Sequence, residues 1–161
     1  MSANSRLTAA VHALAWLELA ARRGHASLTS AEVASSLANN PVQVRQSLGQ
    51  LREAALVRVT GRGPGAGWQL ARPADEITLF EVYDALGDPG PFALHAHDPN
   101  PECTVGSGIR PVLENIYDDV RAAMSQQLRA TTIADVLEEI LAHDTTGWPE
   151  PDSGRRSPVE K

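Results

Sequence analysis

Apolar residues in the first part of the chain recur every three or four positions, which is the spacing of one face of an α-helix. This pattern predicts a helix over residues 6–22 with Leu7, Val11, Leu14 and Leu17 facing inward. Gly24 is expected to end it, because glycine readily adopts the backbone conformation in which helices stop. Thr29 or Ser30 is a suitable N-cap for a second, short helix that reaches Leu37.

A tight turn at residues 39–41 separates the second helix from a third, since Pro41 suits the first position of a helix. The third helix is expected over residues 41–56, with Val44, Leu48 and Leu51 facing inward. The stretches "LVRVT" and "WQLA" flank the glycine-rich "GRGPGAG", which indicates a β-hairpin. Three helices followed by a hairpin predict a winged helix-turn-helix, in which the third helix enters the DNA major groove and the hairpin is the wing.

The pattern after the wing is helical again. Residues 77–86 predict a fourth helix, residues 87–107 a proline-rich loop, and Thr131 or Thr132 the start of a last helix. Between them a long apolar stripe predicts a helix of about twenty residues, which spans roughly 30 Å. Nothing else in this half is large enough to cover the stripe, so we expect a second copy of the chain to do so. The expected dimer interface consists of Ile109, Val112, Leu113, Ile116, Val120 and Met124.

The predicted fold is therefore mainly α-helical with a small β-hairpin wing. Residues 1–86 are expected to form a winged helix-turn-helix domain with its supporting fourth helix. Residues 87–143 are expected to hold a sensor loop and the dimerisation helices. Residues 144–161 contain several prolines and charges and predict a disordered tail.

Charge is divided unequally along the chain. The 161 residues carry 14 Lys and Arg against 20 Asp and Glu, a formal net charge of −6. Residues 1–72 hold eight arginines and three glutamates, which gives +5 and leaves −11 for residues 73–161. Opposite signs in the two halves suggest that one end meets a polyanion while the other stays solvated or pairs with itself.

The glycine-rich stretch does not fit either nucleotide-binding fingerprint. A phosphate-binding loop needs a lysine and a hydroxyl residue after its last glycine, but Gly67 is followed by Trp68 and Gln69. The dinucleotide fingerprint needs a glycine at its sixth place, where this chain has Ala66 or Trp68. The sequence also contains no nucleophile–base pair and no paired carboxylates in a pocket-forming motif, so we do not expect an enzyme.

Cys103 is the chain's one cysteine, which excludes an internal disulfide framework and fits a reducing cytoplasm. No apolar run approaches the roughly 20 residues of a membrane span, so no membrane association is expected. The N-terminal stretch has polar breaks and ends in two arginines, and it therefore reads as an amphipathic helix rather than a signal peptide.

Four stretches of the chain resemble the Rrf2 family of bacterial winged-helix regulators, which includes IscR, NsrR and CymR. They are "SRLTAAVHALAWL", "NPVQVRQSLGQLREAALV", "GRGPGAGWQLARPADEITLFEVYDAL" and "PNPECTVGSGIRPVLENIYDDV". The wing pattern from Arg62 to Trp68 is specific for the family, and the segment around Cys103 looks most like its YwnA-like branch, which lacks a three-cysteine signature. The resemblance extends over residues 5–143. It implies a dimeric DNA-binding transcription regulator, usually a repressor, with a crossed long helix as the dimer interface.

The resemblance also assigns DNA contacts, since family members place the first turns of the third helix in the major groove and the wing arginine in the minor groove. The positions carried over are Val42, Gln43, Arg45 and Gln46 on the helix and Arg62 on the wing. Glutamine can pair with adenine and arginine with guanine, each pair contributing ~1–3 kcal/mol of discrimination. Further contacts are expected from the helix starts and the wing backbone, at Thr29, Ser30, Asn40, Gly63 and Gly65. Ordinary solvent exposure is the alternative for Arg45 and Arg52.

The loop before the long helix is the candidate sensor. Iron–sulfur members of the family carry three cysteines about six residues apart there; Cys103 matches the middle one, but His97 and Ile109 stand at the other two places. Cluster iron normally takes mainly thiolates, so we expect no metal site. The weaker alternative is a mixed site of His97 and Cys103, completed by His95 or His12 across a dimer.

Three interpretations of Cys103 remain open at this point. It is an inert residue packed on the long helix, a redox thiol whose pKa is lowered by a helix start near Ser107–Gly108, or a ligand to a metal or an iron–sulfur cluster. A small-molecule pocket is a further alternative, and its candidate lining residues are Trp16, Phe80, Tyr83 and Phe92.

We therefore expect a homodimeric transcriptional regulator, a repressor that binds a two-fold-symmetric operator in double-stranded DNA. The expected signal is a redox change or a small-molecule effector near Cys103. No cofactor is expected, with an iron–sulfur cluster as the open alternative. A different class of function is an adaptor that keeps the winged fold but binds proteins instead of DNA, which the acidic total charge motivates.

Overall fold

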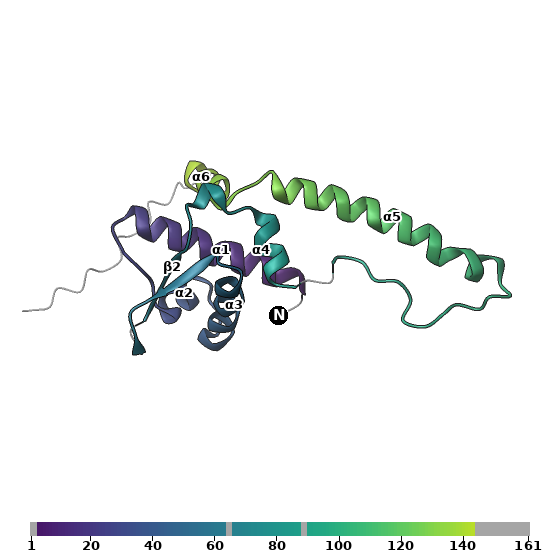
Figure 1. The fold of residues 1–161 in the computed structure, drawn as a ribbon, viewed down its shortest axis with the longest axis horizontal. Coiled ribbons are helices and arrows are strands. Elements are labelled where there is room, and N and C mark those ends of the chain that lie inside the picture. The colour runs from purple at the N-terminus through teal and green to yellow at the C-terminus, as the bar shows by residue number, and fades with distance from the viewer. Residues whose placement is uncertain (1–2, 64–65, 88–89, 144–161) are drawn as a thin grey trace, which may run out of the picture.

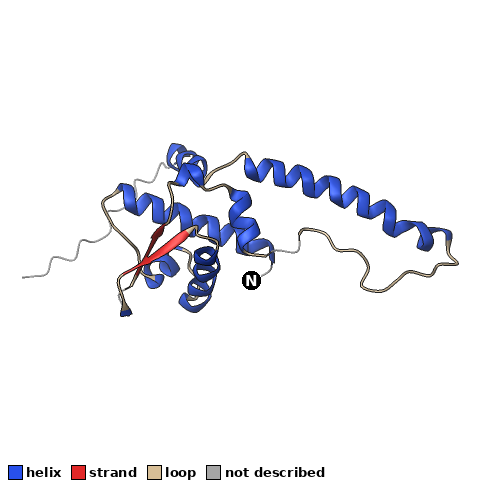
Figure 2. Ribbon diagram, in the orientation of Figure 1, coloured by secondary structure: helices blue, strands red, loops and turns tan. Residues whose placement is uncertain are grey.

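Three helices and a two-stranded antiparallel sheet form the first unit of the chain (Figure 1; Figure 2). The computed structural model describes residues 3–63, 66–87 and 90–143. The elements of this unit are α1 (Ala3–Arg22), α2 (Ser30–Ser36), α3 (Pro41–Glu53), β1 (Val57–Thr60) and β2 (Gly67–Leu70). Their order is that of a winged helix-turn-helix, which confirms the predicted fold class.

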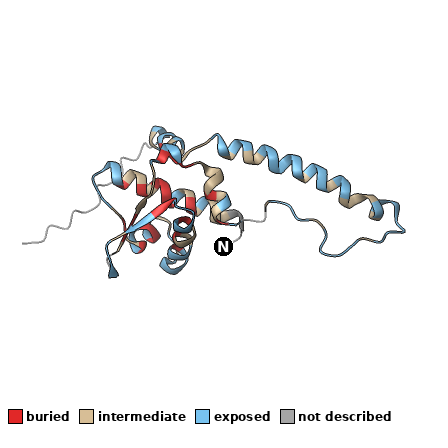
Figure 3. Ribbon diagram, in the orientation of Figure 1, coloured by how far each residue is buried: buried red, intermediate tan, exposed pale blue. Residues whose placement is uncertain are grey.

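An apolar core holds these elements together. Leu14 of α1 is fully buried at its centre, and buried positions appear on all of the surrounding elements (Figure 3). The side chains that pack into this core include Val33 of α2, Leu48 and Leu51 of α3, and Trp68 of β2. The inward positions of α3 are those that the helical periodicity of the sequence predicts, so the same periodicity determines which face of α3 stays exposed.

Polar side chains fix the starts of α2 and α3. The Glu32 N–H donates to the Thr29 hydroxyl at 3.2 Å, while the Glu32 carboxylate accepts the Thr29 N–H at 2.7 Å. The sequence allowed Thr29 or Ser30 at this start, and the structure selects Thr29. At the start of α3 the Asn40 side chain accepts the Val42 N–H at 2.8 Å.

Left-handed backbone conformations fix the ends of α1 and α3. Gly24 adopts φ +87°, and α1 ends at Arg22 as expected for a helix followed by glycine. The predicted end of α3 at residue 56 is wrong, since the helix stops at Glu53. The cause is Ala55, which adopts φ +57° and thereby turns the chain into β1.

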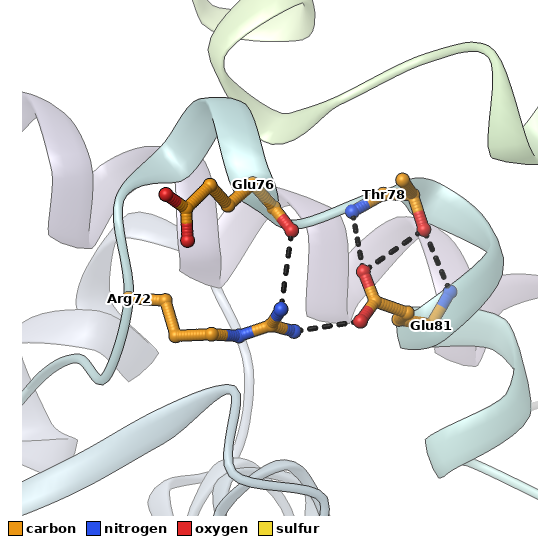
Figure 4. Close-up of polar contacts among 4 residues, drawn as sticks. All are labelled: Arg72, Glu76, Thr78 and Glu81. Atoms are coloured by element: carbon orange, nitrogen blue, oxygen red, sulfur yellow. Dashed lines mark hydrogen bonds and ion pairs between the residues drawn. The ribbon is translucent and has the colours of Figure 1, made fainter.

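Arg72 connects the end of the wing to the start of α4 (Leu79–Ala85; Figure 4). Its guanidinium donates to the Glu81 carboxylate at 2.7 Å and to the Glu76 carbonyl at 3.3 Å. The second carboxylate oxygen of Glu81 accepts the Thr78 N–H at 2.9 Å. The Thr78 N–H, supported by Arg72, lowers the pKa of Glu81. One carboxylate therefore links the wing to the fourth helix.

Backbone hydrogen bonds join the starts of α4 and α6 (Ile133–His143). Thr78 and Thr132 form an isolated antiparallel bridge, flanked by a 2.9 Å bond from the Ile133 N–H to the Ile77 carbonyl. Because Thr78 forms this bridge and the Ile77 carbonyl accepts the flanking bond, α4 begins at Leu79, two residues later than predicted. This junction holds α6 against α1 and against the short 3-10 turn Ala74–Glu76.

Helix α5 (Thr104–Arg129) extends away from the winged unit (Figure 1) and contains no buried residue (Figure 3). At about 1.5 Å per residue, its 26 residues span roughly 39 Å. The predicted start near Ser107–Gly108 is wrong, because the helix already begins at Thr104. Gly106 does not break it: a side chain there would place Cβ 2.2 Å from the Asn100 carbonyl oxygen, so this glycine is needed for close packing of the preceding loop.

Residues 144–161, predicted as a disordered tail, lie outside the described residues. The proposed domain boundaries at residues 86 and 143 stay predictions. In the part of the chain that the structure describes, no helix is both long enough and apolar enough to cross a membrane.

Candidate nucleic-acid interface

The exposed face of α3 begins in its first turn. Because Val44, Leu48 and Leu51 point into the core, the positions between them face solvent. Val42 is 70 % exposed despite being apolar. The other predicted contact residues of this helix are exposed as well: Gln43, Arg45 and Gln46. The structure thus brings together, at one end of one helix, the four side chains expected to reach base edges.

Asn40 defines the geometry of this helix end. Its side chain accepts the Val42 N–H, and its own N–H donates to the Asn39 side chain at 2.7 Å. Pro41 stands in the first turn, where its missing N–H costs no hydrogen bond. The first turn of this 13-residue helix contains no acidic side chain. Its N-terminal end therefore carries an uncompensated partial positive charge that favours a phosphate anion.

The wing presents Arg62 on a loop built by glycines. Gly61 and Gly63 on either side of it adopt φ +81° and φ +78°, backbone conformations that residues other than glycine rarely adopt. The Ala66 N–H donates to the Gly63 carbonyl at 3.0 Å and closes the turn. The Arg62 and Gly63 positions are exposed, whereas Gly65, also expected to contact DNA, lies outside the described residues.

Ser30 is buried, so its hydroxyl is not part of the exposed surface, and the predicted phosphate contact at this helix start stays a prediction for its backbone N–H. Only 6 % of the residue is exposed, and its hydroxyl accepts a 2.9 Å hydrogen bond from the indole Nε1 of Trp68. Trp68 also exchanges two backbone hydrogen bonds with Leu28, at 2.7 and 3.0 Å. The Ser30 hydroxyl therefore serves to hold the wing against α2. The sequence shows the serine as a cap candidate but does not show the tryptophan approaching it.

Thr29 also directs its polar groups into the protein. Its N–H and its hydroxyl both donate to the Glu32 carboxylate at 2.7 Å. A carboxylate beside this helix start opposes a DNA phosphate, so the structure gives Thr29 a capping role first. Its contact with DNA stays a prediction.

The arginines of α3 and the wing differ from several others in how they are paired. In residues 1–72, Arg22 and Arg72 form ion pairs with glutamates. Arg110 and Arg121 in the acidic half form ion pairs with Asp98 and Asp118. Among the described residues, Arg45, Arg52 and Arg62 form no ion pair with any carboxylate. A phosphate backbone that approached α3 and the wing would therefore meet cations without first displacing carboxylates of the protein.

Two arginines with a place in this surface were missed by the sequence reasoning. Arg6 of α1 donates to the Gln50 side chain and to the Leu86 carbonyl, both at 3.0 Å, and so fixes α3 against α1 and α4. Arg58 is exposed on β1, opposite Gln69 in the antiparallel register. The alternation in "VRVT" places Arg58 on the face of the strand opposite Val57, and this signal was available in the sequence.

Cys103 lies at the N-cap of α5 with its side chain exposed. The backbone N–H groups of Gly106 and then Val105 hold the pKa of the Cys103 thiol below its ordinary value. The preceding loop is fixed to the same helix end, since the Cys103 N–H donates to the Asn100 carbonyl at 3.2 Å. Exposure argues against the interpretation of Cys103 as a residue packed under the loop.

The histidines near the loop do not form a recognisable ligand set. His95 and His97 are exposed, and His12 hydrogen-bonds the Ser36 hydroxyl at 3.0 Å. Within residues 3–63, 66–87 and 90–143, no three or more His, Cys, Asp or Glu side chains gather in a way that could hold a metal ion. A metal or cluster site at Cys103 therefore has no three-residue ligand group behind it in the described ranges, and the absence of a cofactor stays a prediction.

The four aromatic residues considered for a ligand pocket pack in different ways, and a pocket lined by all four stays a prediction. Phe80 and Tyr83 lie together on α4, with ring centroids 6.4 Å apart, and Arg129 stands over the Phe80 ring. Phe92 stacks on Tyr117 of α5 at 5.0 Å. Of the four, Trp16 alone lines the groove between α1 and α6.

The predicted dimer residues lie along α5. Val112, Ile116 and Val120 are 55 %, 49 % and 39 % exposed, and Val105 extends the same apolar stripe toward the N-terminus at 68 %. Ile109, Leu113 and Met124 are half-buried. An exposed apolar stripe of this length is typical of a protein–protein interface.

Comparison with known proteins agrees with this geometry. The Rrf2 family model, described as "Iron-dependent Transcriptional regulator", matches residues 3–139. The chain is 33% identical over 140 residues to "Putative HTH-type transcriptional regulator YwnA" of Bacillus subtilis (strain 168), covering 86% of this chain and 98% of that protein. It is 29% identical to the transcriptional regulator IscR of Cereibacter sphaeroides over 80% of this chain and 82% of IscR. The crystal structure of Staphylococcus aureus CymR shares the fold, with TM-score 0.60, 22% identity and coverage of 83% and 96% of the two chains.

Proposed function

The chain belongs to the Rrf2 family of transcriptional regulators, and from this premise we propose that it is a cytoplasmic homodimeric repressor that binds a two-fold-symmetric operator. DNA is the binding partner that membership of this family of transcriptional regulators indicates. The proposal concerns the mode of binding, the oligomeric state, the direction of regulation and the signal.

The observation that carries the proposal is the pair of unpaired arginines held on two coupled elements. Arg45 on α3 and Arg62 on the wing have no carboxylate partner among the described residues. The Trp68–Ser30 hydrogen bond ties the wing to the helix-turn-helix, so the two arginines are held in a defined relation. In the proposed complex α3 lies in the major groove and Arg62 enters the adjacent minor groove. An adaptor that bound proteins would not need unpaired cations on these two elements.

The exposed stripe on α5 supports the homodimer. A monomer would leave Val112, Ile116 and Val120 in water, and burying apolar area contributes about 25 cal/mol per Å². Pairing α5 with its copy buries the stripe on both chains at once, which is the self-complementary contact of a two-fold dimer. Such a dimer presents two copies of α3 to two half-sites of one operator.

The thiol of Cys103 is the proposed signal site. It is exposed, and the amide groups at the start of α5 lower its pKa, so a larger fraction is the reactive thiolate near neutral pH. Peroxide would oxidise it to a sulfenic acid, with water as the other product. Because Cys103 sits on the proposed dimer helix, its oxidation is expected to change the dimer geometry and with it the affinity for DNA. An iron–sulfur cluster is not part of this proposal, since the chain supplies a single cysteine.

A gel-shift assay on the DNA upstream of the protein's own gene tests the proposal. At ~100 mM salt the wild type is expected to form a discrete complex, since specific complexes survive that concentration. Arg62→Ala is expected to weaken it, while Arg129→Ala, which removes an arginine that lies over Phe80 on α4, leaves DNA binding unchanged. Absence of any wild-type complex on that DNA would count against the proposal.

A further inference from the structure

A groove between α1 and α6 lies apart from both the DNA surface and the Cys103 loop. This open groove has a volume of about 680 Å³, which is within the range of small-molecule sites in proteins. Its floor is apolar, with Trp16, Leu19 and Val136 among the lining residues. Ile140 on its α6 side is 52 % exposed.

The polar residues that line the groove include Thr8 and Ser36 and no carboxylate. Arg23, His12 and His143 also line it. His12 is fixed by Ser36, and His143 shares a 2.7 Å hydrogen bond with the Glu139 carbonyl. Arg23 forms no ion pair in the described ranges, in contrast to its neighbour Arg22, which pairs with Glu18 and Glu138.

Two carboxylates near Arg23 are already engaged. Glu138 on α6 is paired with Arg22. Glu32 shares an adjoining hollow with Arg23, but its carboxylate accepts the N–H and hydroxyl of Thr29. The unpaired guanidinium of Arg23 therefore stands at an apolar groove without a local counter-ion.

We propose that this groove binds a small amphipathic anion, an aromatic or aliphatic carboxylate whose apolar body lies against Trp16, Leu19 and Val136 and whose charge pairs with Arg23. Charge complementarity selects this class, since the groove offers a cation and no carboxylate, and its apolar floor gives no partner to a highly polar ligand. A ligand that bridges α1 and α6 also bridges the winged unit to the segment that follows α5. Regulation of DNA binding by such a ligand rests on the proposed function, whereas binding of the ligand to the groove does not.

The test uses the full-length protein and the fluorescent anion 1-anilinonaphthalene-8-sulfonate. We expect saturable binding of one probe per chain, displaced by 1-naphthoate at lower concentration than by the uncharged 1-naphthylmethanol. Arg23→Gln is expected to weaken probe binding about fivefold, as the loss of one partly exposed charge-assisted contact does. Arg52→Gln, which removes an exposed arginine of α3, is the matched control and should leave binding within twofold.

A second pair of variants locates the probe on apolar surface. Ile140→Asp places a negative charge at the groove and should weaken binding more than Arg23→Gln, whereas Ile116→Asp makes the same change on α5. Loss of binding in Ile116→Asp alone would assign the probe to the α5 stripe and overturn the proposal. Dissociation of a dimer by Ile140→Asp in sedimentation, with probe binding retained, would assign the groove to a second copy and also overturn it. Because no DNA is present, failure here is distinguishable from failure of the proposed function.

Discussion

The indole Nε1 of Trp68 donates a 2.9 Å hydrogen bond to the buried hydroxyl of Ser30, which ties the second strand of the wing to the first turn of α2. The wing and the helix-turn-helix are the two surfaces proposed to contact DNA. Their relative position therefore depends on one side-chain pair together with the backbone bridge between Leu28 and Trp68. This coupling leads to the first prediction.

Trp68→Phe removes the donor and leaves the Ser30 hydroxyl buried without it. We expect the free energy of unfolding to fall by about 1–3 kcal/mol, the usual cost of an unsatisfied buried polar group, and more if the smaller ring leaves a cavity. Ser30→Ala alone should also destabilise, because it strands the indole N–H. The double variant Trp68→Phe/Ser30→Ala should cost less than the sum of the two, since neither partner is left unpaired. Urea unfolding of the four proteins measures this, and strict additivity would show that the bond contributes nothing.

Gly67→Ala is expected to destabilise the wing. A Cβ at this position would lie 2.1 Å from the Ser27 hydroxyl oxygen and 2.5 Å from its Cβ, so the segment before α2 would have to move. Gly49→Ala in α3 is the matched control: a Cβ there meets nothing within 4 Å. It should stabilise by about 0.5–1 kcal/mol through helix propensity. Thermal unfolding separates the two, and equal midpoints would contradict the described packing of the wing.

Glu81 makes the stability pH-dependent in the acid range. Its pKa is lowered in the folded protein, first by the Thr78 N–H and then by Arg72, so its contribution is present above the ordinary glutamate pKa of about 4.3. That contribution is lost as the pH falls through the lower folded-state value. Asp135 behaves alike, because the Thr132 N–H lowers its pKa. Glu81→Gln should therefore be less stable than wild type at pH 6, and the difference should shrink toward pH 3. Glu76→Gln, which changes an exposed carboxylate while the Arg72 contact uses the Glu76 backbone carbonyl, is the control.

Ile116→Asp should convert the dimer to a monomer without unfolding it. Ile116 is 49 % exposed in the chain, so a charge there leaves the core intact but would be buried in a paired α5. Asn115→Asp, on the adjacent exposed position, adds the same charge beside the stripe and should preserve the dimer. Sedimentation equilibrium gives the mass of each. A wild type that sediments as a monomer at micromolar concentration would contradict the α5 interface.

The sequence predicted the elements well where local chemistry decides them. The capping pair Thr29–Glu32, Gly24 after α1 and the turn at Pro41 each act within a few residues, and the structure has all three. The start of α5 was placed too late, because Gly106 and Gly108 suggest loop when read alone. Only the approach of the Asn100 carbonyl explains the glycine at 106, and that approach is a tertiary contact.

The candidate site was likewise predictable where helical periodicity decides exposure, but not where contacts between distant residues decide it. The exposure of Val42, Gln43 and Arg45 follows from helical periodicity once Val44 is assigned to the core. The burial of Ser30 depends on Trp68, which is 38 residues away in the chain. The groove beside Trp16 requires α6 to fold back on α1, which no local pattern specifies.

The most direct test of the central claim is a hydroxyl-radical footprint of the wild type and of Arg62→Ala on the DNA upstream of the gene. For a dimer that reads DNA with α3 and the wing, we expect two symmetric protected half-sites on one face of the duplex, separated by one helical turn of about 10 bp or a multiple of it. Arg62→Ala should lose protection at the flanking minor grooves while the central major-groove protection of each half-site persists. A single unpaired site, or no protection in the wild type, would contradict the account.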